Sequence, residues 1–120
     1  MKKILFALAL VPLTASVGLA QNAPAGDAAA GKALWEGNTT ACKNCHGETG
    51  EGAFGPDLAG RGLSWAQFAR AVRRPWGVMP AYTDRQLTDQ RLADIYAYVS
   101  GLPAVSTVGA PRLVASASTP

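Results

Sequence analysis

Residues 42–46 read Cys42-Lys43-Asn44-Cys45-His46, a C-x-x-C-H pattern. In this pattern the two thiols can add to the two vinyl groups of a haem, and the imidazole that follows can ligate the iron. We therefore expect a haem c that is bound covalently through Cys42 and Cys45, with His46 as its proximal ligand. The pattern occurs once in the chain, which predicts a single haem.

Two other chemistries use cysteines at this spacing. A structural zinc ion takes about four protein ligands, and the chain contains only two Cys and one His, which argues against zinc. A thioredoxin-like dithiol is typical of a βαβ context, whereas the segments that flank this motif have helical patterns. Thiol exchange without haem therefore stays open as the weaker alternative.

The first 20 residues have the pattern of a secretory signal. Lys2 and Lys3 precede an apolar stretch at residues 4–13, and Gly18-Leu19-Ala20 supplies the small residues of a cleavage site. Residues 4–20 fall short of the roughly 20 apolar residues that a membrane span needs. We expect cleavage near Ala20, export to the periplasm and no stable membrane span in the mature protein.

Composition divides the rest of the chain into three parts. We expect a short linker at residues 21–25 and a folded domain at residues 26–102. Residues 103–120 are rich in Pro, Ala, Ser, Thr and Val, which is typical of a flexible tail. So small a domain has difficulty in burying enough apolar surface, and a covalently held macrocycle would complete its core. Without Lys2 and Lys3, the 11 basic residues fall to 9 against 8 acidic ones, which gives no reason to expect nucleic acid as a partner.

Two segments predict the terminal helices of the domain. Asp27 is a suitable N-cap for a helix over residues 28–36, in which Gly31 and Trp35 share one face. Thr88 is a suitable N-cap for a last helix whose apolar side chains recur along one face: Leu92, Ile95, Val99 and Leu102. A glycine within a helix suggests that another helix crosses closely there, so we expect the two helices to pack together.

A third helix is predicted between them. Ser64 is its N-cap, Trp65, Phe68 and Val72 form its apolar face, and Pro75 stops it at residue 73. The arginines of its C-terminal part are expected on the opposite, wetter face. Together with one further arginine they form either a basic rim that attracts an acidic partner or an ordinary solvated face: Arg70, Arg73, Arg74 and Arg85.

Two loops carry the remaining candidate residues of the site. The glycine-rich residues 47–62 predict a loop, in which Pro56 has a carbonyl available to accept the second ring N–H of His46. Pro80 favours extended geometry at Met79, the only methionine left after signal cleavage. We expect the Met79 thioether to be the sixth iron ligand; the alternative is that it fills a gap in the core.

The chain resembles the class I c-type cytochromes, in particular the small bacterial members with one haem. The resemblance rests on the C-x-x-C-H motif, on Gly55-Pro56-Asp57-Leu58 and on Val78-Met79-Pro80 before an apolar C-terminal helix. It implies an all-α fold, in which three to four helices surround one covalent haem and the terminal helices cross, with Gly31 and Trp35 against Ile95 and Tyr98. It also implies the axial pair His46 and Met79 and the supporting Pro56 carbonyl. The candidate partners for the haem propionates are Arg61, Trp65 and Trp76.

An iron with both axial positions filled has no vacancy for a substrate. The expected function is therefore electron transfer between redox partner proteins, a dehydrogenase or cytochrome complex as donor and an oxidase or reductase as acceptor. One alternative is a haem enzyme or gas sensor with a labile Met79, against which stands the absence of a second histidine. Another is a cytochrome subunit of a larger dehydrogenase.

Overall fold

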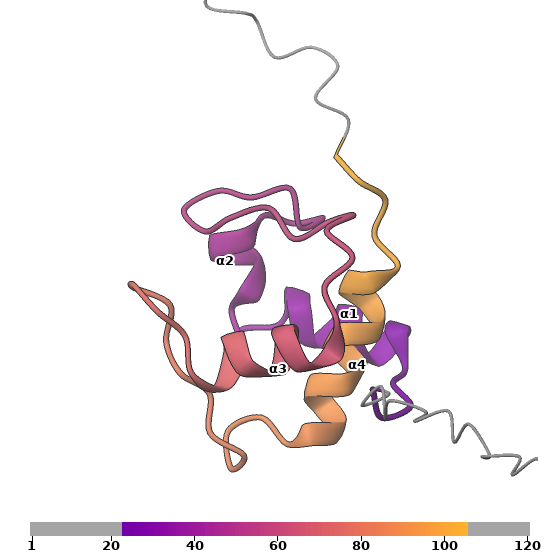
Figure 1. Ribbon diagram of the computed structural model, residues 1–120, viewed down its shortest axis with the longest axis vertical. Coiled ribbons are helices and arrows are strands. Elements are labelled where there is room, and N and C mark those ends of the chain that lie inside the picture. The colour runs from indigo at the N-terminus through magenta and orange to yellow at the C-terminus, as the bar shows by residue number, and fades with distance from the viewer. Residues whose placement is uncertain (1–22, 106–120) are drawn as a thin grey trace, which may run out of the picture.

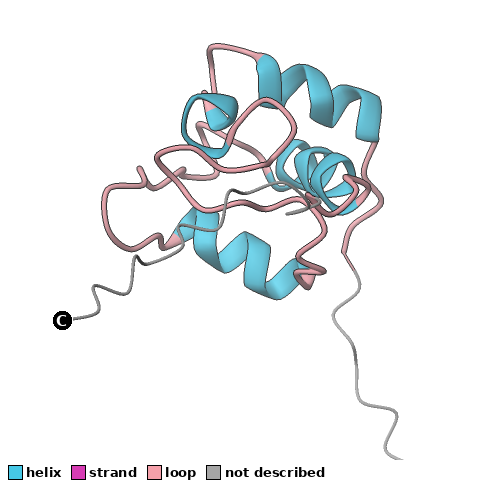
Figure 2. Ribbon diagram, turned by 90° about the horizontal axis from the view of Figure 1, so that it is seen from above, coloured by secondary structure: helices cyan, strands magenta, loops and turns pink. Residues whose placement is uncertain are grey.

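The computed structural model describes residues 23–105, which form a helical domain (Figures 1 and 2). These residues contain four helices and no strand: α1 (Ala28–Glu36), α2 (Cys42–His46), α3 (Trp65–Arg73) and α4 (Asp89–Ser100). The predicted all-α class is confirmed, as are three of the helices. The five-residue α2 was not predicted as a helix, because so short a segment cannot display a helical period.

Three predicted segments fall wholly or partly outside the described residues. The signal at residues 1–20 lies outside them, and so do the first two residues of the linker at 21–25 and most of the tail at residues 103–120. None of the helices in residues 23–105 is both long and apolar enough to cross a bilayer.

Side-chain caps fix where the three longer helices begin. The first N–H groups of a helix have no partner within it, and a capping oxygen supplies one. The Asp27 carboxylate accepts hydrogen bonds from the first turn of α1. Ser64 and Gln67 form a capping box on α3, and the Thr88 hydroxyl accepts from the Arg91 N–H of α4.

The terminal helices α1 and α4 cross in close contact, as predicted (Figure 1). A Cβ at Gly31 would lie 2.9 Å from the Ile95 nitrogen and would overlap the Asp94 carbonyl, so only glycine allows this approach. The Trp35 and Tyr98 rings pack with their centroids 6.0 Å apart. The buried Asp94 carboxylate accepts the Asp27 backbone N–H at 2.9 Å, which ties the start of α1 to α4.

The core lies between α1, α3 and α4 and joins residues far apart in the chain. Its most deeply buried apolar side chains include one from the loop before α4 that was not predicted, Leu87. The cluster consists of Trp35, Phe68, Val72, Leu87, Leu92, Ile95 and Val99. The predicted apolar faces of α1, α3 and α4 therefore meet one another. Most of the side chains in this core also line the candidate site.

Candidate haem site

The short helix α2 carries the C-x-x-C-H motif and presents its three reactive side chains differently. Cys42 is half-buried, Cys45 is exposed and His46 is buried. The preceding residue, Ala41, has a left-handed backbone with φ of 52°, which turns the chain sharply into the helix. The two cysteines form no disulfide with each other, so both thiols are available for thioether bonds.

The loop at residues 47–62 folds back along α2 and holds the His46 ring. Backbone bonds from Gly52 N to the His46 carbonyl (2.8 Å) and from Gly55 N to the Cys45 carbonyl (2.7 Å) bring the loop against the helix. His46 Nδ1 then lies 2.8 Å from the Pro56 carbonyl oxygen. Because a carbonyl only accepts, Nδ1 carries the proton, and Nε2 keeps the lone pair that a metal needs.

Gly55 is the position at which this loop touches the imidazole. A Cβ there would lie 2.9 Å from His46 Cε1 and 3.0 Å from Nδ1, both closer than ordinary contact. The Trp35 ring also packs near the imidazole, with the two ring centroids 6.1 Å apart. The Trp35 indole N–H also donates to the carbonyls of Gly47 and Glu48, both at 3.1 Å. The ring orientation is therefore set by contacts from α1 and from the loop.

His46 and Cys42 open into an apolar pocket that Met79 also lines. The segment with Met79 lies between α3 and α4, and Met79 is half-buried against the core. The other walls come from α1, α3, α4 and both loops, and they include Trp35, Leu58, Phe68, Val72, Leu92 and Ile95. The sequence motifs that lie far apart in the chain thus meet at one pocket.

Burial shifts the ionisation of two groups at this pocket. It raises the pKa of the Cys42 thiol above its ordinary value, an effect that hydrogen bonding around Thr40 only partly opposes. It also raises the pKa of the Tyr82 phenol, with the charge of the nearby cysteines as a smaller cause. Thiols that exchange disulfides have lowered pKa values, so the environment of Cys42 argues against the thiol-exchange alternative.

Tyr82 and Thr40 connect the segment that follows Met79 with the segment that precedes Cys42, and the sequence predicted neither residue. The Tyr82 hydroxyl donates to the Thr40 carbonyl, two residues before Cys42. Thr40 is itself fully buried, and its hydroxyl donates to the Leu34 carbonyl of α1. A tyrosine just after Met79 is a weak signal, because no sequence pattern shows which carbonyl a phenol will reach.

The prediction that Arg73 lies on a wet face with Arg70 and Arg74 is wrong. Arg70 and Arg74 are exposed, but the Arg73 side chain is only 19% exposed and forms ion pairs with Asp84 and Asp89. It lies at the end of α3, where the chain that leads into α4 wraps over it. The two carboxylates come from residues 11 and 16 positions further along the chain. The helical period carries no information about them, and for that reason it wrongly predicted an exposed Arg73.

The candidate propionate partners stay predictions, and they have different surroundings. Arg61 is exposed and donates to the Asp57 carboxylate through Nε at 3.2 Å. Trp65 is half-buried with its ring edge-on to Tyr96, the centroids 5.6 Å apart. Trp76 is 91% exposed.

The donor set fits a covalently attached haem. A half-buried and an exposed thiol flank a buried imidazole, the imidazole proton is held by a carbonyl, and the one thioether in the described residues lines the same apolar pocket. A set for a bare metal ion is absent, since the described residues contain no group of three or more Cys, His, Asp or Glu side chains that could hold one.

Comparisons with known proteins agree with this fit. At 38% identity over 63 residues, the chain matches the "4-cresol dehydrogenase [hydroxylating] cytochrome c subunit" of Pseudomonas putida. The match covers 52% of this chain and 54% of that protein, so it spans about half the length of the relative. A chain from the crystal structure of p-cresol methylhydroxylase with substrate bound has 36% identity and a TM-score of 0.53. That match covers 62% of this chain and 93% of the other.

A family model also matches residues 26–99, nearly all of the predicted domain. It is described as "Cytochrome C oxidase, cbb3-type, subunit III". The chain is therefore a c-type cytochrome that belongs to the family of cbb3-type cytochrome c oxidase subunit III.

Proposed function

We propose that this chain is a periplasmic electron carrier with one haem c attached through Cys42 and Cys45, and with His46 and Met79 as axial ligands. One observation carries the proposal: His46 Nδ1 lies 2.8 Å from the Pro56 carbonyl at the wall of the apolar pocket that Met79 lines. This arrangement leaves Nε2 as the only ring nitrogen able to ligate a metal, and it supplies a soft thioether as a second ligand.

When bound, the haem supplies a couple that gains and loses one electron. The residues of the chain would set the reduction potential of this couple. The hydrogen bond to Pro56 keeps the imidazole in one tautomer and one orientation, and the thioether of Met79 favours the electron-rich state. The apolar walls exclude water and disfavour added charge. The exposed Cys45 would hold the cofactor at a point that solvent reaches.

The chain acts as a carrier rather than as a catalyst in this proposal. With His46 and Met79 as ligands, the iron would have no free position for a substrate, and His46 is the only histidine of the chain. A peroxidase-like or gas-sensing function needs Met79 to leave readily. The test is to add imidazole and cyanide to the ferric holoprotein: weak, slow binding fits a carrier, whereas rapid tight binding favours the alternative.

Two variants test the haem site. Haem that stays with the polypeptide after denaturation and acid–acetone extraction supports the thioether bonds; Cys42→Ser and Cys45→Ser together should release it. Met79→Leu keeps the size and apolar character of the side chain but removes the sulfur. It should abolish the thioether-to-iron charge-transfer band of the ferric protein and lower the reduction potential. An unchanged band and potential would exclude Met79 as a ligand.

The proposed domain limits are residues 26–102, with a signal removed near Ala20 and a flexible tail from residue 103. The family match over residues 26–99 supports the first of these, and the charged and apolar pattern of residues 1–20 supports the second. The mass of the protein purified from the periplasm tests cleavage: the mature chain should begin near Gln21 and carry one haem.

The proposed partner is a dehydrogenase for which the chain is the cytochrome subunit. The relative from Pseudomonas putida, described as the cytochrome c subunit of a dehydrogenase, supports this. A free shuttle between a donor and an oxidase or reductase is the second candidate. Gel filtration of the periplasmic fraction distinguishes the two: a subunit should coelute with a larger protein that holds its own redox centre.

We propose that this partner docks on a groove formed by the outer face of α3 and the start of the Met79 loop. The groove is lined by Gln67, Arg70, Ala71, Arg74 and Trp76. Within the described residues, Arg70 and Arg74 have no carboxylate within ion-pair distance. Two exposed cations beside an exposed indole fit an acidic partner surface that also offers an apolar contact.

Charge reversal at the groove tests this surface. The double variant Arg70→Glu and Arg74→Glu should slow electron exchange with the coeluting partner by roughly tenfold or more at low salt, because steering depends on charge. The difference should shrink at high salt. Arg85→Glu changes the charge in the same sense but lies outside the groove lining, and it serves as the control. Equal rates for all three proteins would remove the groove from the proposal.

A further inference from the structure

The loop that carries Met79 is held at its two ends and hardly in between. In the described part of the chain, no backbone-to-backbone hydrogen bond begins or ends on residues 75–81. Two of their side chains point into solvent, with Trp76 91% and Val78 99% exposed. The loop closes where Tyr82 N donates to the Val72 carbonyl at 3.1 Å. Besides the packing of its own side chain against the core, the position of Met79 therefore depends on how firmly the chain is held from Tyr82 onward.

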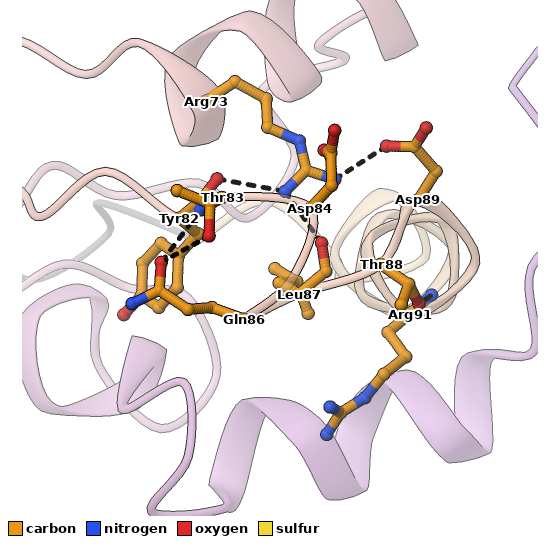
Figure 3. A network of polar contacts seen from close by, with 9 residues as sticks. All are labelled: Arg73, Tyr82, Thr83, Asp84, Gln86, Leu87, Thr88, Asp89 and Arg91. Atoms are coloured by element: carbon orange, nitrogen blue, oxygen red, sulfur yellow. Dashed lines mark hydrogen bonds and ion pairs between the residues drawn. The ribbon is translucent and has the colours of Figure 1, made fainter.

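Arg73 holds that part of the chain (Figure 3). Its Nη1 donates to the Tyr82 carbonyl at 3.0 Å and to the Leu87 carbonyl at 2.7 Å. Its Nη2 lies 2.6 Å from an Asp89 carboxylate oxygen and 3.1 Å from one of Asp84. One guanidinium thus contacts four residues that follow Met79, from the end of its loop to the first residue of α4.

The geometry requires an arginine rather than any cation. A guanidinium has five donors in a rigid planar fork, so it can serve two carbonyls and two carboxylates at once, whereas an ammonium is a single point charge on a flexible stem. Leu87, one of the two residues whose carbonyls it binds, is fully buried in the core. Loss of the guanidinium would leave that carbonyl without this donor.

The held segment also leads back to the haem-attachment motif. The Tyr82 carbonyl accepts the hydrogen bond from Arg73, and the Tyr82 hydroxyl donates one to the carbonyl of Thr40, two residues before Cys42. A shift of Tyr82 would therefore loosen the Met79 loop from α3 and from the segment that precedes α2.

We propose that Arg73 is a positioning residue that keeps the Met79 thioether at the haem iron and thereby sets how readily the sixth position opens. This inference rests on the proposed axial role of Met79. Arg73 is not itself among the residues that line the pocket, but it binds the backbone carbonyls of two that are, Tyr82 and Leu87. Its effect passes through the backbone of the Met79 loop.

The test uses the ferric holoprotein with Arg73→Gln, Arg73→Lys and, as a matched control, Arg85→Gln. Arg85 belongs to the same segment but has no ion pair in the described residues. Imidazole binds only when Met79 has left, so its apparent dissociation constant scales inversely with the open fraction. We expect Arg73→Gln to bind imidazole roughly tenfold more tightly than the parent, Arg73→Lys to be intermediate, and Arg85→Gln to be unchanged.

A second measurement does not depend on the iron. Hydrogen exchange at the Tyr82 amide, which is bonded to Val72, should become faster in Arg73→Gln and stay at the parental rate in Arg85→Gln. Parental imidazole affinity together with parental exchange in Arg73→Gln would overturn the proposal. If Arg73→Gln gives no holoprotein, Arg73→Lys decides by the same two measurements, because an ammonium cannot replace the fork.

Met79→Leu separates the two proposals. If it removes the thioether band and Arg73→Gln behaves as its control, only the role of Arg73 fails. If Met79→Leu leaves the band and the imidazole affinity unchanged, the axial role of Met79 fails, and the positioning role of Arg73 fails with it.

Discussion

Replacing Gly55 by Ala should disturb His46 directly, because this glycine lies against its ring. An added Cβ would be 2.9 Å from His46 Cε1, whereas ordinary contact begins at 3.4 Å, so the ring or the loop must give way by about 0.5 Å. The loop is held by the Gly55 N–H bond to the Cys45 carbonyl at 2.7 Å, and a Cβ would lie only 3.2 Å from that carbonyl. Because this bond holds the loop, we expect the displacement to fall on the ring, against its hydrogen bond to the Pro56 carbonyl.

A ring that moves by this amount weakens its hydrogen bond to Pro56, which is now 2.8 Å long. Such a bond contributes about 0.5–1.5 kcal/mol, and overpacking of a tight site costs about 1–3 kcal/mol. We expect the free energy of unfolding of the holoprotein to fall by about 1–3 kcal/mol. For a domain of this size, that is roughly 4–8 °C in Tm for each kcal/mol. The potential should rise, because an imidazole that donates its proton less strongly gives less electron density to the iron.

Thermal unfolding and redox titration of the holoprotein measure both effects. Gly101→Ala is the matched control, because its backbone is helical and its added Cβ would meet only ordinary contacts at 3.5 Å and beyond. If Gly55→Ala unfolds at the parental temperature and keeps the parental potential, the contact does not restrain the ring, and the reasoning from this loop is refuted.

Two further predictions concern the helix crossing and acid stability. Gly31→Ala should destabilise the protein by about 2 kcal/mol, since overpacking against the α4 backbone, at the upper end of about 1–3 kcal/mol, outweighs the roughly 1 kcal/mol that Ala gains in a helix. An unfolding midpoint in denaturant equal to or higher than that of the parent would contradict this. Hydrogen bonding from Arg61 lowers the pKa of Asp57 below its ordinary value of 3.8. The ion pair therefore adds to the free energy of unfolding above about pH 3.8, and this contribution is lost as the pH falls through the lowered pKa of Asp57. The difference in unfolding midpoint between the parent and Arg61→Gln should therefore close in acid. A difference that widens in acid would exclude the pair as its cause.

Much of the fold follows from local patterns. The predicted caps Asp27, Ser64 and Thr88 all act as caps, and the predicted bounds of α1 and α3 match those observed. These features depend on interactions within a few residues, namely a capping oxygen, an apolar face or a proline, and such interactions can be read from neighbouring letters. Gly31 is the instructive case, because its position within a helix indicated a close crossing before any partner was known.

The failure at Arg73 has the opposite cause. Its position in the helical period places it with Arg70 and Arg74, and nothing nearby in the sequence distinguishes the three. The carbonyls of Tyr82 and Leu87 and the carboxylate of Asp89 come from a chain segment that returns over the end of α3. Long-range acceptors of this kind have no local signature, so the sequence misassigns a structural arginine to the surface.

By itself the sequence determines the chemistry of this protein: the two thiols and the imidazole of Cys42, Cys45 and His46 specify what can be attached, and Met79 is the one thioether outside the predicted signal. Covalent reactivity and ligand softness belong to residue types, so spacing suffices to recognise them. The tertiary structure alone decides how these groups are held. It sets the tautomer of His46 through Pro56 and anchors the Met79 loop through Arg73, because hydrogen-bond geometry exists only after distant segments have packed together.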